Sequence, residues 1–545
     1  MLIYGGVNSV YVLKEDRGQT PEYALPCSLV NKEASLGKTM QTDFLSSGKR
    51  IRLGIWGLGR GGNFIDSARA LGIDVVAGCD YNEHMRRNFA ATCPDAFVTD
   101  DEDAFLAQDF DAVLVATWFP AHAKDSIKAL RAGKHVMCEV TSFMTPAEGV
   151  ALVEAVESSG KVYNLLENYP FSKENQYARK LWQEGFFGDF IYGEYDYNHD
   201  CRTLSYTYID GVPVNPGWEA HNWRSWLPAH YYCTHSLGPV MRITGLRPVS
   251  VVAHPVGVAV PGRFPRGGYN EGTLTPSLFR MSNGGVMRNL MGEGTGDTHA
   301  RRLWGTRASY DFTHDPEIRV GCSGHGRILH VKPEWPEFGD LAEKAGHGGG
   351  DFWELFYFAR EILTGEPGPW TLYDACDVTI AGIMANRSSR AGGTPMEVPD
   401  FRDPAVRERY RDDDEIPEHM DPKRIFPDGH DTRITKDFAT VMSNFSGFWE
   451  DKGLILVRNA RDGMRLYPDL ATDTDRFAVQ SDVRRLLREL PAFADNCRAA
   501  KRILEAYPDC PAAAAIRSSL EIADAAWVLD TDNALEELRA WLLQA

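Results

Sequence analysis

The chain has 545 residues, of which 43% are hydrophobic and 25% charged, the usage of an ordinary globular protein rather than a disordered or fibrous one. This length exceeds what one hydrophobic core supports, so we expect roughly three or four domains of ~150 residues each. The formal net charge of −18 repels phosphates and anionic membrane surfaces, and so argues against nucleic acid and membranes as partners.

Residues 1–50 are expected to form an N-terminal extension without chemistry, because the first strong periodic signal begins at Ile51. The segment lacks the apolar stretch of an export signal, and no run of ~20 apolar residues occurs elsewhere. The 10 cysteines are scattered without a C-x-x-C pair, which indicates neither a zinc ribbon nor a dense disulfide framework. We therefore expect a soluble, cytoplasmic protein.

Residues 51–170 are predicted to form a Rossmann domain with a doubly wound parallel sheet. Strands that are buried on both faces lose the alternation of polar and apolar residues. Five segments have this character: IRLGIWG, VVAGCD, AVLVAT, KHVMCEV and KVYNLLEN. Helices are expected between them, for example from Ala121 to Ala132 and from Pro146 to Ser158.

Residues 171–400 change to longer segments rich in Gly, Tyr and Trp, which predict an α+β domain with an open antiparallel sheet. A helical stretch is expected in it from Asp351 to Ser388. Residues 401–545 are expected to begin with a polar linker, RDPAVRERYRDDDEIPEHMDPKR, and to end in a helical C-terminal extension. The extension carries apolar residues at helical spacing: Val483, Leu486, Leu487 and Leu490. The fold class predicted for the whole chain is therefore α/β.

A glycine-rich turn follows the first predicted strand, where Gly57, Gly59 and Gly62 have G-x-G-x-x-G spacing. In a dinucleotide-binding turn the three glycines provide, in order, a tight turn, close approach of the backbone to the pyrophosphate, and close packing of helix against strand. The phosphates would lie at the helix N-terminus, where unpaired N–H groups favour anions. This turn predicts a dinucleotide site.

The second predicted strand ends at Asp80, about 20 residues after the first glycine. A carboxylate there accepts hydrogen bonds from the ribose hydroxyls and repels a 2′-phosphate, which favours NAD over NADP. Arg86 and Arg87 follow closely and keep NADP open. Thr117 and His122 lie after the fourth strand, where strand ends face the ligand crevice, so they are predicted cofactor contacts. A packing role at the start of a helix is the alternative for His122.

Several motifs together resemble the Gfo/Idh/MocA family of oxidoreductases over residues 51–400. They are GLGRGG, the strand ending at Asp80, TWFPAH, GKHVMCEV and HSLGPVMRITGLRPV. The resemblance implies a Rossmann domain followed by an open antiparallel sheet. In that family's ordinary dehydrogenases the glutamate matching Glu139 is usually followed by Lys-Pro, and the lysine handles the proton of the substrate hydroxyl. Val140 and Thr141 take those places here, and valine cannot move a proton.

A second departure lies in YYCTHSLGPV, where the family's dehydrogenases typically carry D-x-G-x-H-x-x-D and this chain keeps only His235. Both departures resemble the NAD-dependent α-N-acetylgalactosaminidase branch of glycoside hydrolases, which shows Glu-Val-Pro and Tyr-Pro-Thr-His-Gly-x-Gly-Pro. The matching segments are Glu139-Val140 and Tyr232 to Pro239, with further matches in GHGGGD, LYDA and GTPMEVPDF. Three positions differ from the branch pattern: Thr141, Cys233 and Ser236.

This resemblance implies an NAD-dependent glycoside hydrolase that oxidises its sugar transiently. Removal of a hydride from C3 gives a ketone, which acidifies the hydrogen on C2 and allows the group on C1 to be eliminated. Water then adds, and the hydride returns to C3, so the cofactor is regenerated. Such an enzyme does not need the carboxylate pair of the usual glycosidase.

The resemblance also suggests roles for individual residues. We expect His235 and Tyr232 to exchange protons with the C3 hydroxyl and with C2, since both side chains can be tuned for proton transfer. Glu139 is expected to hold the nicotinamide ribose or a catalytic water, or to assist the leaving group. Three further residues are expected at the site: Asn168 at the cofactor, and His199 and Tyr310 as catalytic residues of the substrate pocket. A hydrogen-bonded core position is the alternative for each histidine.

The segment GWEAHNWRSW is a candidate sugar-binding wall, because aromatic rings pack on the C–H faces of sugars while Arg and His donate hydrogen bonds. Ordinary core packing is the alternative. The expected substrate-binding residues are Arg202, His221, Trp223 and Arg224, and the two arginines admit an anionic sugar. No metal is predicted, because Asp200 beside His199 lacks a third ligand at coordination spacing.

Two other functions stay open. A net sugar dehydrogenase that forms a 3-keto sugar would need another residue in place of the missing lysine. A non-enzymatic sensor would bind a dinucleotide and use the C-terminal helices for a partner, and the retained His235 argues against it. For the enzyme we expect a small carbohydrate as substrate and a homo-oligomer, since exposed sheet faces and added helices favour self-association.

Overall fold

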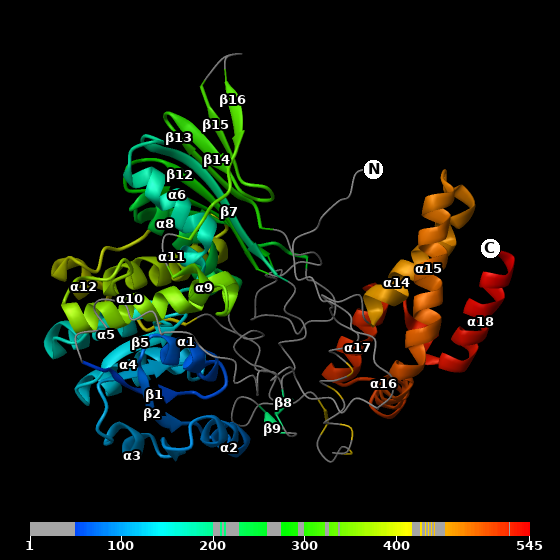
Figure 1. Ribbon diagram of the computed structural model, residues 1–545, viewed down its shortest axis with the longest axis horizontal. Coiled ribbons are helices and arrows are strands. Elements are labelled where there is room, and N and C mark those ends of the chain that lie inside the picture. Colours follow the sequence, from blue (N-terminus) through cyan, green and yellow to red (C-terminus); the bar gives the residue numbers. More distant parts are fainter. Residues whose placement is uncertain are drawn as a thin grey trace. The chain divides into compact units, whose positions relative to one another are not determined.

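The computed structural model describes residues 49–199, 208–209, 212–213, 228–258, 274–292, 299–321, 326–335, 338–416, 426–427, 431, 434, 438, 441, 453–522 and 524–545. The chain divides into two compact units, Met1–Gln41 and Thr42–Ala545, and every described residue belongs to the second. Figure 1 shows two large sheets and the helices of the described parts, together with a two-stranded sheet of β8 (Tyr208–Ile209) and β9 (Val212–Pro213).

The first sheet is parallel and has six strands in the order β3-β2-β1-β4-β5-β6. This order reverses direction between β1 and β4, and the ends of those strands form the crevice in which such sheets bind ligands. The strands are β1 (Arg52–Trp56), β2 (Asp74–Cys79), β3 (Phe97–Thr99), β4 (Ala112–Val115), β5 (His135–Glu139) and β6 (Tyr163–Leu166). The sequence did not indicate β3, a short edge strand.

Helices connect these strands, and their ends have recognisable causes. The side chain of Thr145 accepts a hydrogen bond from the N–H of Glu148 at the start of α5, Pro146 occupies its first turn, and Gly160 ends it in the left-handed region at φ 61°. The helices are α1 (Ile65–Ala70), α2 (Glu83–Thr92), α3 (Glu102–Leu106), α4 (His122–Arg131) and α5 (Pro146–Ser159), with short 3₁₀ turns η2 (Gly61–Phe64), η3 (Phe119–Ala121) and η4 (Tyr169–Phe171).

The second sheet has nine strands in the order β16-β15-β14-β13-β7-β12-β11-β10-β17. It is mixed rather than wholly antiparallel, because β7 and β12 pair in parallel while the other neighbours are antiparallel. Burial alternates along β11, and alternation alone does not reveal the direction of a neighbouring strand. The strands are β7 (Phe190–Asn198), β10 (Pro248–Ala253), β11 (Leu274–Met281), β12 (Val286–Gly292), β13 (Arg301–Gly305), β14 (Ala308–Asp311), β15 (Glu317–Val320), β16 (Arg327–His330) and β17 (Met396–Glu397).

Further helices link the two sheets. The stretch expected to be helical from Asp351 to Ser388 is two helices, because Gly365 ends the first in the left-handed region and Thr371 with Asp374 caps the second. The expected polar linker begins with helix α12, and Arg387 beside it binds both oxygens of Asp413. The helices are α6 (Lys173–Gln183), α8 (Thr234–Thr244), α9 (Gly339–Ala342), α10 (Gly350–Thr364), α11 (Leu372–Arg390) and α12 (Pro404–Tyr410), with the 3₁₀ turns η6 (Ala229–Tyr232) and η7 (His347–Gly349).

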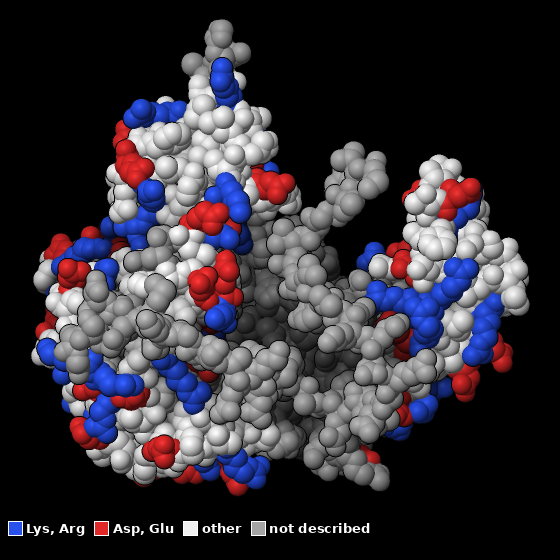
Figure 2. All heavy atoms as spheres, viewed as in Figure 1, with Lys and Arg blue, Asp and Glu red and all other residues white. Residues whose placement is uncertain are grey.

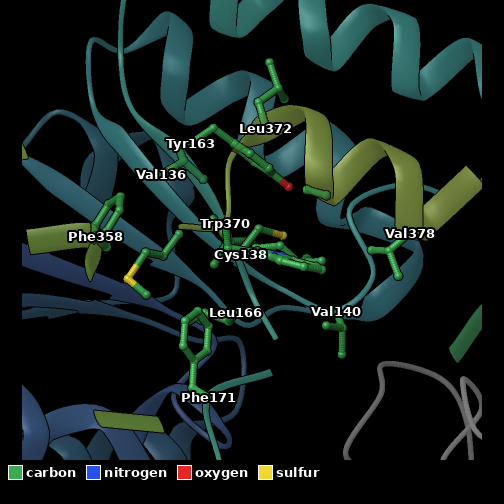
Figure 3. Close-up of a cluster of buried hydrophobic side chains, with 14 of the residues drawn as sticks. Val136, Cys138, Val140, Tyr163, Leu166, Phe171, Phe358, Trp370, Leu372 and Val378 are labelled. Atoms are coloured by element: carbon green, nitrogen blue, oxygen red, sulfur yellow. The ribbon is translucent and has the colours of Figure 1, made fainter. Parts of the chain in front are cut away.

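One continuous hydrophobic core spans both sheets and the helices between them. Figure 3 shows part of it, where Val136 and Cys138 of β5 and Tyr163 of β6 lie near Trp370 and Leu372 of the later segment. Helices α10 and α11, which lie about 200 residues further along the chain, both contact β6. The Rossmann sheet therefore depends on this later segment for part of its core. Figure 2 shows acidic and basic side chains interspersed over the two-sheet part on the face in view.

The C-terminal helices have a second core of their own, in which Val483, Leu486 and Leu538 are fully buried. This agrees with the helical spacing in the sequence. The helices are α14 (Leu454–Leu466), α15 (Asp473–Glu489), α16 (Ala494–Ala506), α17 (Pro511–Ile522) and α18 (Thr531–Gln544). None of the helices in the described parts combines the length and apolar character that a membrane span requires.

Candidate active site

The glycine-rich turn leaves β1 at the edge of the ligand crevice. Gly57 has φ 92°, and a Cβ there would lie 2.1 Å from the carbonyl oxygen of Ala116, so only glycine fits. A Cβ at Gly59 or Gly62 would meet nothing within 4 Å. Close packing of helix against strand, expected at Gly62, is found instead at Gly61, where a Cβ would lie 2.6 Å from Cγ2 of Ile55. The open side of the turn at Gly59 and Gly62 suits a pyrophosphate.

Asp80 lies at the end of β2 and binds the same turn. Its Oδ2 accepts a hydrogen bond from the N–H of Leu58 at 2.8 Å, and its Oδ1 accepts one from Asn82 at 2.8 Å. Burial raises the pKa of Asp80, and these two N–H groups oppose that effect in part. Each oxygen keeps a lone pair for a ribose hydroxyl.

The two arginines that kept NADP open are engaged elsewhere. Arg86 donates to the carbonyl oxygens of Asp80 and Tyr81, both at 2.8 Å, and its other terminal nitrogen lies 3.3 Å from Asp100. Arg87 pairs with Glu83 on its own helix. Neither guanidinium is held ready for a 2′-phosphate, so this crevice fits NAD better than NADP.

Thr117 and His122, predicted cofactor contacts, hold the backbone of the crevice together. The Thr117 hydroxyl donates to Oδ2 of Asp125 at 2.6 Å. The buried His122 ring places Nδ1 2.9 Å from the carbonyl oxygen of Thr141 and Nε2 3.2 Å from that of Thr117. His122 therefore joins the loop after β4 to the segment after β5. These contacts fit the alternative prediction for His122, a packing role at the start of a helix.

Glu139 at the end of β5 belongs to a network with Arg60 and Asp351, here called the Arg60 network. Nε of Arg60 lies 2.7 Å from Oε1 of Glu139, and its two terminal nitrogens each lie 2.8 Å from one oxygen of Asp351. Asn168 donates to Asp351 at 3.3 Å, and Nδ1 of His347 lies 3.0 Å from it. The network fastens the glycine-rich turn to the end of β5 and to the start of α10.

The opposite charges in the Arg60 network offset the free-energy cost of burying each of them. Burial alone would raise the pKa of Asp351, but the hydrogen bonds and charges of Arg60 and His347 hold that pKa well below its usual value. Burial likewise disfavours the guanidinium, while Glu139 and Asp351 raise the pKa of Arg60 above its usual value. Arg60 also lies over the ring of Phe64, 4.5 Å from its centroid.

Glu354 lies on α10, one turn after Asp351, and has no partner of its own among the described residues. It is 3% exposed, and neither carboxyl oxygen has a hydrogen bond. Burial, reinforced by the nearby charges of Asp351 and Glu139, raises the pKa of Glu354 well above its usual value. Burial therefore favours the protonated form of Glu354 beside the Arg60 network.

Replacing Glu354 with glutamine is expected to stabilise the protein increasingly as the pH rises above the usual carboxyl value of 4.5. In the unfolded chain Glu354 ionises above that value, while in the fold it keeps its proton, so its contribution to the free energy of unfolding falls with pH until the raised pKa is reached. The difference between variant and wild type should grow by up to ~1.4 kcal/mol per pH unit. Denaturant unfolding of the apo protein between about pH 5 and 7 measures it. A difference independent of pH would mean that folded Glu354 is ionised.

His235 forms a pair with Glu167, here called the His235–Glu167 pair. Nδ1 of His235 lies 2.8 Å from Oε2 of Glu167, and both side chains are buried. Glu167 directly follows β6, and its other oxygen accepts the N–H of Tyr169 at 3.2 Å. A carboxylate on Nδ1 fixes the ring orientation and leaves Nε2 as the nitrogen that can exchange a proton.

Three tyrosines surround the His235 ring. Tyr169 stacks on it with centroids 4.7 Å apart and planes 17° apart, Tyr197 meets it edge-on at 4.8 Å, and Tyr232 lies at 4.5 Å. The sequence paired Tyr232 with His235 correctly in space. His199 is further out, because its ring contacts Tyr197 at 5.6 Å. His299, which the sequence did not indicate, lies 5.7 Å from Tyr197 and 6.4 Å from Tyr169.

The structure does not place Tyr310 in this cluster. Its ring stacks on Phe312 at 4.5 Å, neighbours Phe187 and Tyr177, and is 1% exposed. Burial raises the pKa of Tyr310, which suits a core residue and not a proton donor. The contacts of Tyr310 in the structure are packing contacts, and its expected catalytic role stays a prediction. The four expected substrate-binding residues lie outside the described residues: Arg202, His221, Trp223 and Arg224.

The sequence analysis also missed Glu167, Arg60, Asp351 and Glu354, and the first three of these had a signal. Glu167 follows a parallel strand as Glu139 does, and the rule that strand ends face the crevice applies to both. Arg60 lies inside the glycine-rich turn, and Asp351 ends the GHGGGD motif. Glu354 had no signal beyond its place one turn later. Among the described residues, no group of three or more His, Cys, Asp or Glu side chains is arranged to hold a metal ion.

Two family models match the chain. Residues 51–166 match the oxidoreductase family with an NAD-binding Rossmann fold, and residues 330–407 match the C-terminal domain of glycosyl hydrolase 109. Residues 51–166 are therefore similar to an NAD-binding oxidoreductase domain, and residues 330–407 to the C-terminal domain of glycosyl hydrolase 109. The predicted resemblance to the Gfo/Idh/MocA family and its glycosidase branch is confirmed, as are the Rossmann fold and NAD as the cofactor.

Curated relatives agree with these matches. A glycosyl hydrolase family 109 protein of Stenotrophomonas maltophilia is 25% identical over 425 residues, which cover 68% of this chain and 93% of that protein. One of Streptomyces niveus is 28% identical and covers 67% of this chain and 80% of its own length. An alpha-N-acetylgalactosaminidase of Tannerella forsythia is 26% identical over 54% of this chain and 71% of that enzyme.

Solved structures share the fold. A levoglucosan dehydrogenase in complex with NADH and levoglucosan aligns with a TM-score of 0.53 at 19% identity, covering 64% of this chain and all of that one. An oxidoreductase domain protein from Kribbella flavida aligns with a TM-score of 0.54 at 18% identity, with 64% and 100% coverage. At this level of identity the likeness concerns the fold alone.

Proposed function

We propose that the protein is an NAD-dependent glycoside hydrolase that acts by transient oxidation of a sugar at C3, elimination, water addition and re-reduction. One observation supports the proposal: Tyr232 lies beside the His235–Glu167 pair, while Val140 occupies the position of the lysine in the dehydrogenases that the chain resembles. The match of residues 330–407 to glycosyl hydrolase 109 supports the same chemistry.

The residues of the crevice fit the cofactor. Gly59 and Gly62 would face the pyrophosphate, Asp80 would accept the ribose hydroxyls, and the Arg60 network would brace the turn that holds both. When bound, NAD supplies the hydride acceptor and donor for C3 of the sugar. Glu139 is held by Arg60 with a side chain that is 12% exposed, so its carboxylate is positioned at the rim of the crevice.

The proton transfers fall to the residues around His235. Nε2 of His235 would take the proton of the C3 hydroxyl, because Glu167 stabilises the imidazolium that results. In its phenolate form, Tyr232 would remove the proton from C2 as the bond from C1 to the leaving group breaks, and it would return a proton to C2 when water adds to C1. Solvent would supply the proton that the leaving group takes up and would accept the proton that the added water loses. The stacked Tyr169 and edge-on Tyr197 keep the imidazole in one orientation.

The test records aglycone release and reduced-nicotinamide absorbance together, with purified protein, NAD and a panel of chromogenic α- and β-glycosides. We expect aglycone release without accumulation of NADH. In D₂O the sugar product should also gain deuterium at C2, which a direct displacement at C1 would not cause. Hydrolysis without deuterium at C2 would refute the elimination step.

A net sugar dehydrogenase is the second candidate, because the His235–Glu167 pair can also serve as the base in place of the missing lysine. NADH that rises in step with substrate loss would establish it. Absence of turnover over the whole panel would leave a dinucleotide-binding sensor. A small carbohydrate substrate, a homo-oligomer, a cytoplasmic location and domain boundaries near residues 50, 170 and 400 remain our proposals, and light scattering of the purified protein tests the homo-oligomer.

A further inference from the structure

A pocket of about 400 Å³ lies beside the start of α6, and is here called the Lys173 pocket. Three aromatic side chains form its walls: Tyr169, Tyr195 and Trp335. Two cations, Lys173 and Arg301, open into it, together with His347. None of these residues was given a substrate role above.

The Lys173 pocket adjoins both parts of the candidate site. Tyr169, which lines it, stacks with its ring on His235. His347, which also lines it, contacts Asp351 of the Arg60 network at 3.0 Å. The Lys173 pocket therefore shares Tyr169 with the His235 cluster and contacts the Arg60 network through His347.

The two cations lack acidic partners among the described residues. Nε of Arg301 is buried without a hydrogen bond, and its guanidinium lies 5.9 Å from the centroid of the Tyr195 ring. Nζ of Lys173 lies 5.9 Å from the centroid of the Trp335 ring, and no ion pair joins it to a described carboxylate. A cation without a counter-ion in a pocket is stabilised by a bound anion.

Two carboxylates also line the pocket, and neither forms an ion pair with Lys173 or Arg301. Glu343 accepts a hydrogen bond from Nε1 of Trp335 at 3.2 Å, and Glu174 lies in the first turn of α6, where the helix dipole favours a carboxylate. Ser172, the N-cap of α6, and Lys173, its first residue, also line the pocket. Aromatic walls with cations between them match a ring that carries an oxyanion.

We propose that the Lys173 pocket is a subsite for an anionic ring, a sugar or aglycone that bears a carboxylate, sulfate or phosphate group and is linked to the sugar at His235. This proposal rests on the proposed function, because the sugar to which the anionic ring is linked is the sugar that reacts at His235. The aromatic walls pack on the ring, and Arg301 and Lys173 bind the oxyanion. The substrate class is therefore an acidic glycoside.

The test measures binding, so that it does not depend on turnover. Quenching of tryptophan fluorescence in the NAD-loaded protein reports binding of galactose, galacturonate, galactose 6-sulfate and galactose 6-phosphate, and the three acidic sugars distinguish the source of the oxyanion. We expect at least one acidic sugar to bind ~10–100-fold more tightly than galactose, the gain of one charge-assisted hydrogen bond. Equal binding of neutral and acidic sugars would overturn the proposal.

Variants assign the effect to the pocket. Arg301→Gln and Lys173→Gln should each reduce the preference for the acidic sugar ~10-fold, and Arg301→Lys should retain part of it. Arg319→Gln is the matched control, because Arg319 lies on the same sheet but pairs with Glu317 on its own strand. Equal loss in Arg319→Gln and Arg301→Gln would refute the assignment. Preferential binding of acidic sugars without hydrolysis of any glycoside would support the subsite and refute the proposed function. Hydrolysis of glycosides without preferential binding of acidic sugars would refute only the subsite.

Discussion

Replacing His235 with asparagine is expected to lower kcat ~10²–10⁴-fold, the usual contribution of a positioned proton-transfer group. Asparagine fills much of the same space but cannot exchange a proton at neutral pH. The affinity for NAD should stay within a few-fold, because His235 does not touch the glycine-rich turn or Asp80. Aglycone release measures kcat, and quenching of tryptophan fluorescence during titration with NAD measures the affinity.

The matched control for this prediction is His135→Asn. His135 lies at the other end of the parallel sheet, at the start of β5, where its Nδ1 accepts the N–H of Val162 at 3.0 Å. This variant should retain kcat. Glu167→Gln should lower kcat ~10–100-fold without unfolding the protein, because the amide keeps the shape of the carboxylate but does not stabilise the imidazolium. Equal kcat values in His235→Asn and His135→Asn would contradict the proton-transfer role.

Replacing Asp351 with asparagine is expected to lower the free energy of unfolding by about 3–5 kcal/mol and to weaken NAD binding. The change leaves the half-buried Arg60 guanidinium with Glu139 as its remaining hydrogen-bonded carboxylate, and it weakens the attachment of the glycine-rich turn to α10. Denaturant unfolding with and without NAD measures both effects.

The pH dependence of this loss has a definite sign. The pKa of Asp351 is lowered in the fold, so its contribution is complete above the usual carboxyl value of 3.8 and disappears as the pH falls below it. The difference between wild type and Asp351→Asn should therefore shrink in acid. Asp377→Asn is the matched control, because Asp377 is also buried between two arginines, Arg247 and Arg402, but none of them belongs to the crevice. Asp377→Asn should destabilise the protein without changing its affinity for NAD. If Asp377→Asn lowered the affinity as much as Asp351→Asn does, the role of the Arg60 network in holding the glycine-rich turn would be contradicted.

The sequence predicts best those features that neighbouring residues determine. Gly57 and Asp80 were found because a strand, a glycine turn and a second strand end follow each other within a short segment. Tyr232 and His235 are one helical turn apart and were paired for the same reason. Gly61 was missed because spacing in the motif does not reveal which of two adjacent glycines meets Ile55.

Partners that are distant in the chain were not predictable from patterns. Glu167 and His235 are 68 residues apart, and Arg60 and Asp351 are 291 apart, so only the folded backbone brings them together. Tyr310 was expected at the site because tyrosines serve both as proton donors and as core residues, and burial decides between them. The parallel pairing of β7 with β12 was missed because a strand with one buried face looks the same in either direction.

The long reach of Arg60 also sets an order of events during synthesis. Arg60 and Glu139 emerge from the ribosome early, but Asp351 follows Arg60 by 291 residues, which takes roughly 15–60 s at usual rates of elongation. During that interval the guanidinium has half of its final partners, and α10 and α11 have not yet covered β6. The nascent Rossmann segment should therefore bind NAD weakly, and the crevice becomes complete only when the later helices return to it.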